Sequence, residues 1–357
     1  MIKVFLLTIS MLVSTLFFFF KKPTENTEIM MPPPMACETL VGTAKIVCLA
    51  ENLKATLSET LLAQLQLPYS VTDAKKWSNF PQAFSRPSRV GLPFAMLNEQ
   101  QLAAAKALMI NVLGQGTPNE GYDELEGTLL ADDYFGKAVG KTNTFGSGNY
   151  LIAFLGKPSA TELWELQFGG HHFAFGNTYK GGKIVGVTPS FRGVEPEQSI
   201  EINSRTYQPL AQEHAAFSKI LEILSESEKN TAKLSTNFRD ILLGPNKDGQ
   251  FPTTKQGLRI GDLTTAKQEA VIIAIQLYVN DLDAATAKTI MAKYTAELAD
   301  TYLAYSGSGT MNQGGDYIRL DGVNLWIEYS AQPSRDFPNT SHPHSVWRDR
   351  QSDYGGN

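Results

Sequence analysis

Hydrophobic and polar residues recur along this chain with two periods, one typical of helices and one typical of strands. The clearest helical pattern covers residues 97–114, where Asn98 is a candidate N-cap and Gln101 follows it by three residues, as in a capping box. Three later segments also repeat apolar residues at helical spacing: 209–234, 263–281 and 283–305. We therefore expect one early helix and a helical middle of the chain.

Other segments are rich in the residues that strands prefer. Three of them are close enough in sequence to form an antiparallel meander: 149–156, 163–179 and 183–189. Residues 316–332 hold two more strand-like runs around Asp321-Gly322, a dipeptide typical of hairpin turns. Helices and strands occur in blocks, so the expected fold class is α+β. We expect an antiparallel sheet built from the middle and C-terminal strands and packed with helices.

The N-terminus differs from the rest of the chain, because an uncharged apolar run over residues 4–20 follows Lys3 and is closed by two lysines. This pattern is typical of a signal peptide or a membrane anchor, and no A-x-A cleavage pattern decides between them. We therefore expect an exported protein that is periplasmic, extracellular or attached to the membrane. The predicted division is 1–22 signal peptide or membrane anchor, 23–36 linker, and 37–357 single α+β domain.

The composition of the 357 residues narrows the function classes. With 42% hydrophobic and 10% aromatic residues, the chain has ample material for a buried core. The charged fraction is 19% and the net charge is -5, without the basic stripe that binding to a phosphate backbone requires, so no nucleic-acid partner is expected. Cys37 and Cys48 are the only cysteines, and they fit either a disulfide or two separate thiols.

Histidine is concentrated in two short motifs, G-G-H-H and H-P-H. Four of the five histidines of the chain lie in them: His171, His172, His342 and His344. Neutral imidazole is the commonest protein ligand for zinc, copper and iron. We therefore expect these histidines to bind a divalent transition metal, and the sequence does not distinguish among these three metals.

The local backbone decides which of these rings can meet. Neighbouring side chains on a strand point to opposite faces, so only one of His171 and His172 is expected at the site unless the preceding glycines bend the chain. Pro343 favours an extended backbone, so the rings on either side of it project from a stiff strip. Alternatively, the pair is one packed and one exposed residue, and the H-P-H unit is a solvated tail.

Two charged residues near these motifs are candidate catalytic residues. Glu328 lies in a largely apolar strand, where a carboxylate is usually paired, hydrogen-bonded or bound to a metal. Arg348 follows the H-P-H unit and is a candidate to bind an anionic substrate or to orient a histidine. His214, the fifth histidine, lies in a predicted helix without a partner pattern and is interpreted as a surface or packing residue. The sequence contains neither H-E-x-x-H nor G-x-S-x-G, the motifs of zincin proteases and α/β-hydrolases.

Several blocks of the sequence resemble those of a known family: FLGKPSATELWELQFGGHHFAFGNTY, VGVTPSFRGVEP, IEYSAQ and SHPHSVWRDRQSDYGG. They are similar to blocks of an exported bacterial family known only as a domain of unknown function, number thirty-five hundred. The resemblance runs from about Arg86 to the C-terminus and implies a single domain, but it implies no reaction. The common site that it implies consists of His171, His172, Glu328, His342, His344 and Arg348.

These observations together predict an exported, metal-dependent enzyme that acts on a small-molecule substrate. The expected ligands are His171, His342 and His344. His172 is expected as a ligand or a support, and Glu328 as a ligand or general base. Hydrolysis is favoured because a metal with an open coordination position activates water, and redox chemistry at copper or iron is the close alternative. A non-catalytic protein that binds a metal or small ligand at the cell surface is the alternative from another class, and an interaction domain with structural histidines is a third.

Overall fold

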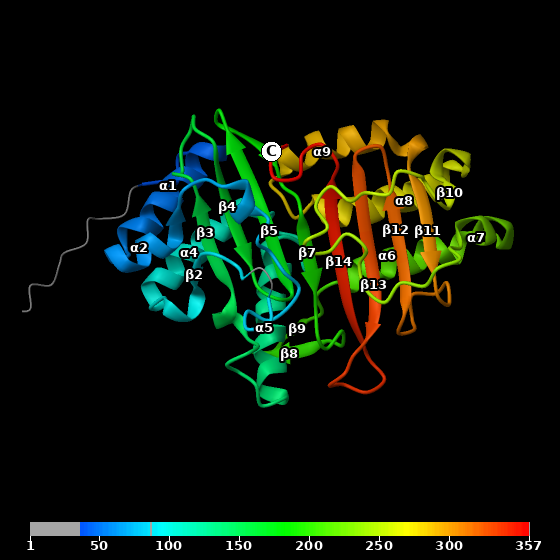
Figure 1. Cartoon of the computed structure of the whole chain (residues 1–357), viewed down its shortest axis with the longest axis horizontal. Coiled ribbons are helices and arrows are strands. Elements are labelled where there is room, and N and C mark those ends of the chain that lie inside the picture. The colour runs from blue at the N-terminus through cyan, green and yellow to red at the C-terminus, as the bar shows by residue number, and fades with distance from the viewer. Residues whose placement is uncertain (1–35, 86–87, 357) are drawn as a thin grey trace, which may run out of the picture. The chain divides into compact units, whose positions relative to one another are not determined.

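A large and mostly antiparallel sheet organises the structure (Figure 1). The computed structural model describes residues 36–85 and 88–356, and within them this sheet has 12 strands. In spatial order its main path is β1 (Gln66–Leu67), β3 (Leu151–Leu155), β4 (Trp164–Gly169), β5 (Phe173–Lys180), β7 (Ser190–Gly193), β14 (Ser341–Asp349), β13 (Leu325–Pro333), β12 (Asp316–Asp321), β11 (Tyr302–Ser306) and β10 (Leu258–Arg259). The two remaining strands lie beside this path: β2 (Leu92–Pro93) on β3 and β6 (Lys183–Gly186) on β5.

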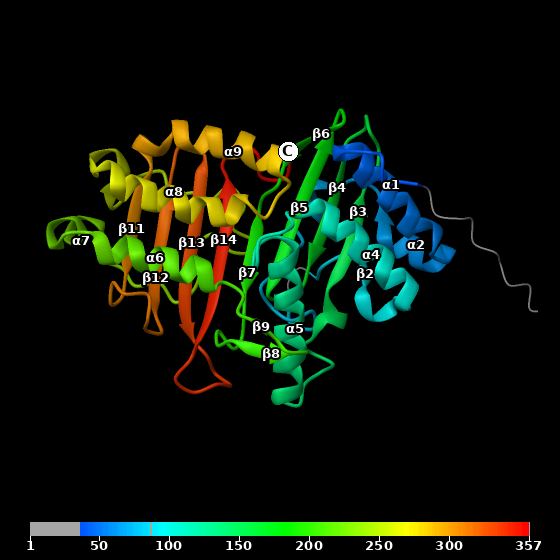
Figure 2. The same ribbon diagram turned by 180° about the vertical axis from the view of Figure 1, so that it is seen from behind.

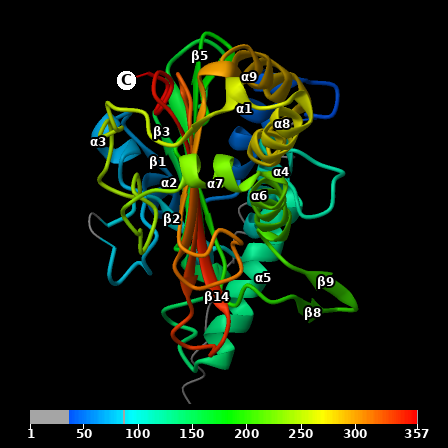
Figure 3. The same ribbon diagram turned by 90° about the vertical axis from the view of Figure 1, so that its right-hand side faces the viewer.

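Helices cover one face of this sheet (Figures 2 and 3). Those on the half formed by β3, β4 and β5 are α1 (Gly42–Ala55), α4 (Glu99–Val112) and α5 (Tyr122–Ala138). Those on the half formed by β11 to β14 are α6 (Ala211–Ile223), α8 (Thr265–Val279) and α9 (Ala284–Ala296). Both halves bury large apolar and aromatic side chains under these helices, so this face holds most of the hydrophobic core.

The opposite face is covered mainly by irregular chain, as the view along the sheet shows (Figure 3). Residues 68–85, which include α3 (Val71–Ala74), and residues 233–257 cross this face. A small apolar cluster joins them to the sheet, with Trp77 and Ile241 from the covering segments packed against Phe191 and Val346 from the strands. Because few apolar contacts hold these segments, buried polar side chains must do much of the anchoring.

Short elements complete the structure. The helices and 3-10 turns not yet named are α2 (Glu59–Leu65), α7 (Glu226–Ala232), η1 (Phe94–Met96), η2 (Ser147–Asn149), η3 (Ile260–Asp262) and η4 (Leu298–Asp300). A separate two-stranded sheet consists of β8 (Ile200–Ile202) and β9 (Arg205–Tyr207).

The α+β fold class and several local predictions are confirmed. The capping box of α4 forms, since Gln101 N donates to Asn98 Oδ1 over 2.9 Å and Asn98 N donates to Gln101 Oε1 over 3.0 Å. β12 and β13 form the predicted antiparallel hairpin, with the turn closed between Gly322 and Leu325. Cys37 and Cys48 form a disulfide, which decides between the two alternatives for this pair.

Three predicted elements are wrong in part. The helical segment 209–234 forms two helices, α6 and α7, because the chain is extended at Leu224 and Ser225 caps a new helix. Residues 163–179 are not one strand but the hairpin of β4 and β5, because the chain turns at Gly170, whose N–H donates to Phe173 O over 2.8 Å. A Cβ on Gly170 would lie 2.5 Å from the ring of Tyr150, so only glycine fits there. The helix predicted over 283–305 ends at Ala296, and its last residues form β11, because pairing with β12 outweighs their helix propensity.

The helix α5 was not predicted from the sequence. Its buried face includes Glu124, Thr128 and Asp132 beside leucines and a phenylalanine, so polar residues interrupt the apolar pattern that marks a helix. This helix matters because it delivers Asp132 to the histidines described below.

The predicted signal peptide or anchor, residues 1–22, lies outside the described residues, as does nearly all of the predicted linker. All described elements belong to one compact unit, Pro33–Asn357. None of the helices in the described part of the chain has the length and apolar character that a membrane span requires.

Candidate metal centre

Three histidines from the two sequence motifs meet at one point, although about 170 residues separate the motifs. His172 lies in the turn before β5, whereas His342 and His344 lie on the same face of β14. β7 runs between these strands, and its Gly193 leaves room for the rings. A Cβ at this position would lie 3.0 Å from His344 and 3.1 Å from His172. The topology of the sheet therefore creates the cluster, which we name the histidine trio.

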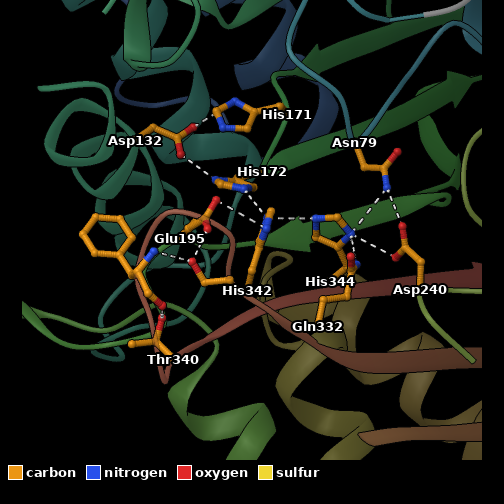
Figure 4. A network of polar contacts seen from close by, with 12 residues as sticks. Asn79, Asp132, His171, His172, Glu195, Asp240, Gln332, Thr340, His342 and His344 are labelled. Atoms are coloured by element: carbon orange, nitrogen blue, oxygen red, sulfur yellow. Dashed lines mark hydrogen bonds and ion pairs between the residues drawn. The ribbon is translucent and has the colours of Figure 1, made fainter. Parts of the chain in front are cut away.

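The Nε2 atoms of the histidine trio converge (Figure 4). His342 Nε2 lies 2.9 Å from His172 Nε2 and 3.1 Å from His344 Nε2. Two nitrogens that bind one zinc ion at the usual bond length of about 2.0–2.1 Å lie roughly 3 to 3.4 Å apart. The spacing of these atoms is therefore close to that of ligands on a single metal ion.

Each ring of the trio has a carboxylate at its other nitrogen. Asp132 Oδ1 lies 2.6 Å from His172 Nδ1, Glu195 Oε2 lies 3.4 Å from His342 Nδ1, and Asp240 Oδ1 lies 2.9 Å from His344 Nδ1. The three acids come from α5, from the segment after β7 and from the segment 233–257. A carboxylate behind a histidine is the usual way in which proteins orient a metal-binding ring and fix its proton on the outer nitrogen.

With the proton of each ring on Nδ1, this arrangement places three nitrogen lone pairs face to face. When Nδ1 donates its proton to a carboxylate, Nε2 of the same neutral ring carries only a lone pair. A single proton on His342 Nε2 can form a good hydrogen bond to only one of the two neighbouring Nε2 atoms. A metal cation between the rings stabilises all three nitrogens at once. The geometry therefore fits a cation better than a network of hydrogen bonds.

The surroundings also keep these rings neutral, which is the state that binds a metal. Burial, with the neighbouring imidazoles, holds the pKa of His172 and of His342 well below its usual range. Burial raises the pKa of Asp132, against the hydrogen bond that Tyr150 donates to it over 2.5 Å. A cation bound to the trio would lower the pKa of Asp132 again, because it favours the charged carboxylate.

His344 has two further polar neighbours at Nδ1. Gln332 Nε2 lies 2.7 Å away and Asn79 Nδ2 lies 3.4 Å away. If His344 binds a metal through Nε2, its proton is on Nδ1, so Asp240 accepts it and the side-chain amide of Gln332 presents its oxygen instead of its nitrogen.

The trio reaches solvent through its central member. The side chain of His342 is 22% exposed, whereas those of His172 and His344 are 1% and 6% exposed. The connection between β13 and β14 lies beside it, where Ser334 Oγ donates to Glu195 over 2.5 Å. Among the described residues, no other His, Cys, Asp or Glu joins the three Nε2 atoms. A metal ion held there would keep a position for water or a substrate.

Comparison with known proteins places the chain in a family. The profile of DUF3500, described as a protein of unknown function, matches residues 40–356. The chain belongs to this family. The match begins well before Arg86, so the DUF3500 region also includes the α1 helix and Cys48 of the disulfide. No curated protein and no solved structure matches the chain.

In this DUF3500 chain the two neighbouring histidines have different surroundings. His172 belongs to the trio, whereas His171 lies beside Asp132, with its Nδ1 3.4 Å from Asp132 Oδ2 and its ring 5.1 Å from that of Phe145. The expectation that His171 joins the H-P-H histidines therefore differs from the structure, which brings His172 there. The cause is the turn at Gly170, which replaces the simple alternation of a strand.

The structure places Glu328 away from the trio, contrary to its expected role as a ligand or general base. Its carboxylate is buried and accepts four hydrogen bonds. The donors are Leu242 N, Leu243 N, Tyr317 Oη and Trp326 Nε1, at 2.5, 2.7, 2.6 and 2.7 Å. Burial raises the pKa of Glu328 and these donors oppose the shift. All of its strong acceptor positions are thus used inside the protein.

Arg348 is also occupied by structural contacts. Its Nε donates to Asp353 over 2.8 Å, one Nη donates to Asp248 over 2.5 Å, and the other donates to Leu243 O over 3.2 Å. The side chain is fully buried, and its guanidinium lies over the rings of Trp77 and Phe251. In this DUF3500 chain Arg348 therefore ties the covering segments to the sheet, and the structure brings it to no histidine of the trio.

The three carboxylates of the site were not predicted from the sequence. Asp132 lies in an unpredicted helix, Glu195 follows a four-residue strand, and Asp240 lies in irregular chain. Their positions in the sequence follow no motif that includes the histidines, because each acid reaches its histidine only through a long-range contact in the fold. One signal was available: Glu195 falls in the VGVTPSFRGVEP block that carries the family resemblance.

Proposed function

We propose that this protein is a metal-dependent enzyme whose transition metal is held by His172, His342 and His344. The chemistry that this site supports best is hydrolysis of a small-molecule substrate. The observation that carries the proposal is the convergence of three Nε2 atoms, each on a ring with a carboxylate at its other nitrogen.

The residues of the site have distinct tasks in this proposal. The trio holds the metal. Asp132 and Asp240 orient His172 and His344 and hold the proton at their Nδ1 atoms, and Glu195 lies 3.4 Å from Nδ1 of His342. The exposed side of His342 is where water and substrate approach. A divalent metal with three histidine ligands and an open position activates water at neutral pH and polarises a carbonyl or phosphoryl group.

The first test is the metal content of protein purified without a histidine tag. Elemental analysis of the wild type is expected to give about one transition-metal ion per chain, with zinc, copper and iron as the candidates. The variant His342→Ala, His344→Ala is expected to contain almost none. His214→Ala is the matched control, because His214 contacts Met311 O and lies outside the trio. Equal metal content in the wild type and the double variant would refute the proposal.

The second test separates an enzyme from a metal carrier. Hydrolysis of 4-nitrophenyl esters and phosphate esters is measured with metal-loaded protein, with protein treated with a chelator, and after addition of the metal again. Turnover that follows the metal and is lost in His342→Ala supports the enzyme. Tightly bound metal without any turnover of the ester probes, together with release to a partner chelator, would favour a non-catalytic metal-binding protein.

Export is part of the same proposal and rests only on residues 1–22 of the sequence. Fractionation of cells that express the full chain is expected to recover it outside the cytoplasm or at the membrane. Recovery from the soluble cytoplasm with Met1 to Lys22 intact would contradict this expectation.

A further inference from the structure

Glu328 makes an unusual set of contacts for a side chain outside the site. Two of its four hydrogen bonds come from consecutive backbone amides, Leu242 N and Leu243 N, in the segment 233–257. This segment has no helix or strand of its own, so its path across the sheet depends on such contacts. Glu328 therefore fixes the position of this segment on the sheet.

The fixed segment leads directly to the histidine trio. Asp240 lies two residues before Leu242 and contacts His344 Nδ1 over 2.9 Å. Between them, Ile241 is buried in the cluster that contains Phe191, and the ring of Phe191 packs against that of His344 at 5.3 Å. A shift of the backbone at 242–243 would therefore move Asp240 relative to His344.

Glu328 also shares a face of the sheet with the site. In the register of β13 and β14 it lies opposite Val346, while Ser330 lies opposite His344 and Gln332 opposite His342. Directly opposite residues of antiparallel strands project to the same side, as do residues two apart on one strand. The carboxylate thus lies on the same face of the sheet as the trio but is turned to its four donors.

We propose that Glu328 is a positioning residue of the metal centre: it holds Leu242 and Leu243 so that Asp240 orients His344. This role rests on the proposed metal site. Glu328 touches neither the metal nor a substrate, and it acts through Asp240 on the ring that binds the metal.

The experiment uses Co²⁺ as the probe, because its visible spectrum reports the coordination geometry and competition with a chromophoric chelator reports its affinity. Glu328→Gln keeps the size of the side chain but replaces one acceptor oxygen by a donor. It is expected to weaken Co²⁺ binding about 10-fold and to change the spectrum, since the loss of groups that orient ligands costs about 10- to 100-fold in affinity.

Glu165→Gln is the matched control. Glu165 is another fully buried carboxylate on the same face of the sheet, but it accepts from Thr178 and contacts neither the segment 240–243 nor the trio. This variant is expected to leave the Co²⁺ affinity and spectrum unchanged. An equal change in both variants would show a general effect of buried charge and overturn the role of Glu328.

A double-mutant cycle with Asp240→Asn tests the route of the effect. If Glu328 acts through Asp240, the double variant binds Co²⁺ no more than about 2-fold more weakly than Asp240→Asn alone. Additive effects of the two changes would overturn the proposed route. If Glu328→Gln does not fold, Tyr317→Phe removes only one donor to Glu328 and replaces it in the cycle, with an expected loss of about 3-fold.

The outcomes also separate this role from the function proposed above. A wild type that binds no Co²⁺ would overturn the metal site and with it the positioning role. A wild type that binds Co²⁺ with an affinity and spectrum that Glu328→Gln leaves unchanged would overturn the positioning role alone.

Discussion

Two groups of polar side chains meet on the same face of the sheet, and they differ in how their hydrogen-bonding capacity is used. Around Glu328 and Arg348, each charged group is surrounded by protein donors or acceptors. In the histidine trio, the outer nitrogens have carboxylate partners, but the inner nitrogens have only one another. A buried charge with all of its partners stabilises the fold, whereas lone pairs directed at a common point indicate a ligand.

The largest expected effect is on the free energy of unfolding. Arg348→Met is expected to lower the free energy of unfolding by about 3–5 kcal/mol, because it leaves Asp248 and Asp353 without their cation in a buried setting. Chemical denaturation of the metal-free protein measures the change. A loss below about 1 kcal/mol would show that Arg348 is not the structural anchor described here.

The next effect concerns the two neighbouring histidines. His172→Ala is expected to weaken Zn²⁺ binding more than 100-fold, or more than about 2.7 kcal/mol, because it removes one of three ligands. His171→Ala is the matched variant and is expected to cost less than about 10-fold, because His171 contacts Asp132 and the ring of His172 but adds no nitrogen to the trio. Competition titration with a chelator compares the two, and the reverse order would exchange their roles.

A smaller effect is expected from the carboxylate behind His172. Asp132→Asn keeps an acceptor but removes the charge, and is expected to weaken Zn²⁺ binding about 10- to 100-fold. Tyr150→Phe removes only the hydrogen bond to Asp132 and is expected to cost about 3-fold. Titration of both variants tests the order; a larger loss in Tyr150→Phe than in Asp132→Asn would contradict it.

The smallest expected effect is the response of the metal-free protein to acid. The folded state holds His172 and His342 neutral with lowered pKa values, whereas the unfolded chain binds protons at these residues below about pH 6.5. Acid therefore favours unfolding, and each of these two residues is expected to lower stability by about 1 kcal/mol between about pH 6.5 and 5.5. Denaturation curves of the wild type and His172→Ala, with His214→Ala as control, measure this slope, which is expected to be shallower only in His172→Ala.

Much of the fold followed from local sequence signals, and so did the histidines of the site. The capping box of α4, the hairpin of β12 and β13 and the H-P-H strand depend on neighbouring residues, so their patterns were readable. The choice between His171 and His172 depended on a turn that packs Gly170 against Tyr150, a contact between separate segments of the chain. The roles of Asp132 and Asp240 depend on long-range packing, which no local pattern encodes.

Only part of the role of Glu328 could be predicted from the sequence of its strand. Its position in an apolar strand correctly indicated a carboxylate with strong partners. The identity of those partners, two amides of a distant segment and two side chains of the sheet, could not be predicted from the strand alone. A buried acid near a histidine motif is therefore ambiguous until its donors are known.

The most direct measurement is a crystal structure of protein purified without a tag, with anomalous diffraction recorded at the absorption edge of the metal found by elemental analysis. The account predicts a single anomalous peak about 2.0–2.2 Å from the Nε2 atoms of His172, His342 and His344. A peak at Asp132 and His171 instead, or no peak at the trio in protein that carries metal, would contradict it.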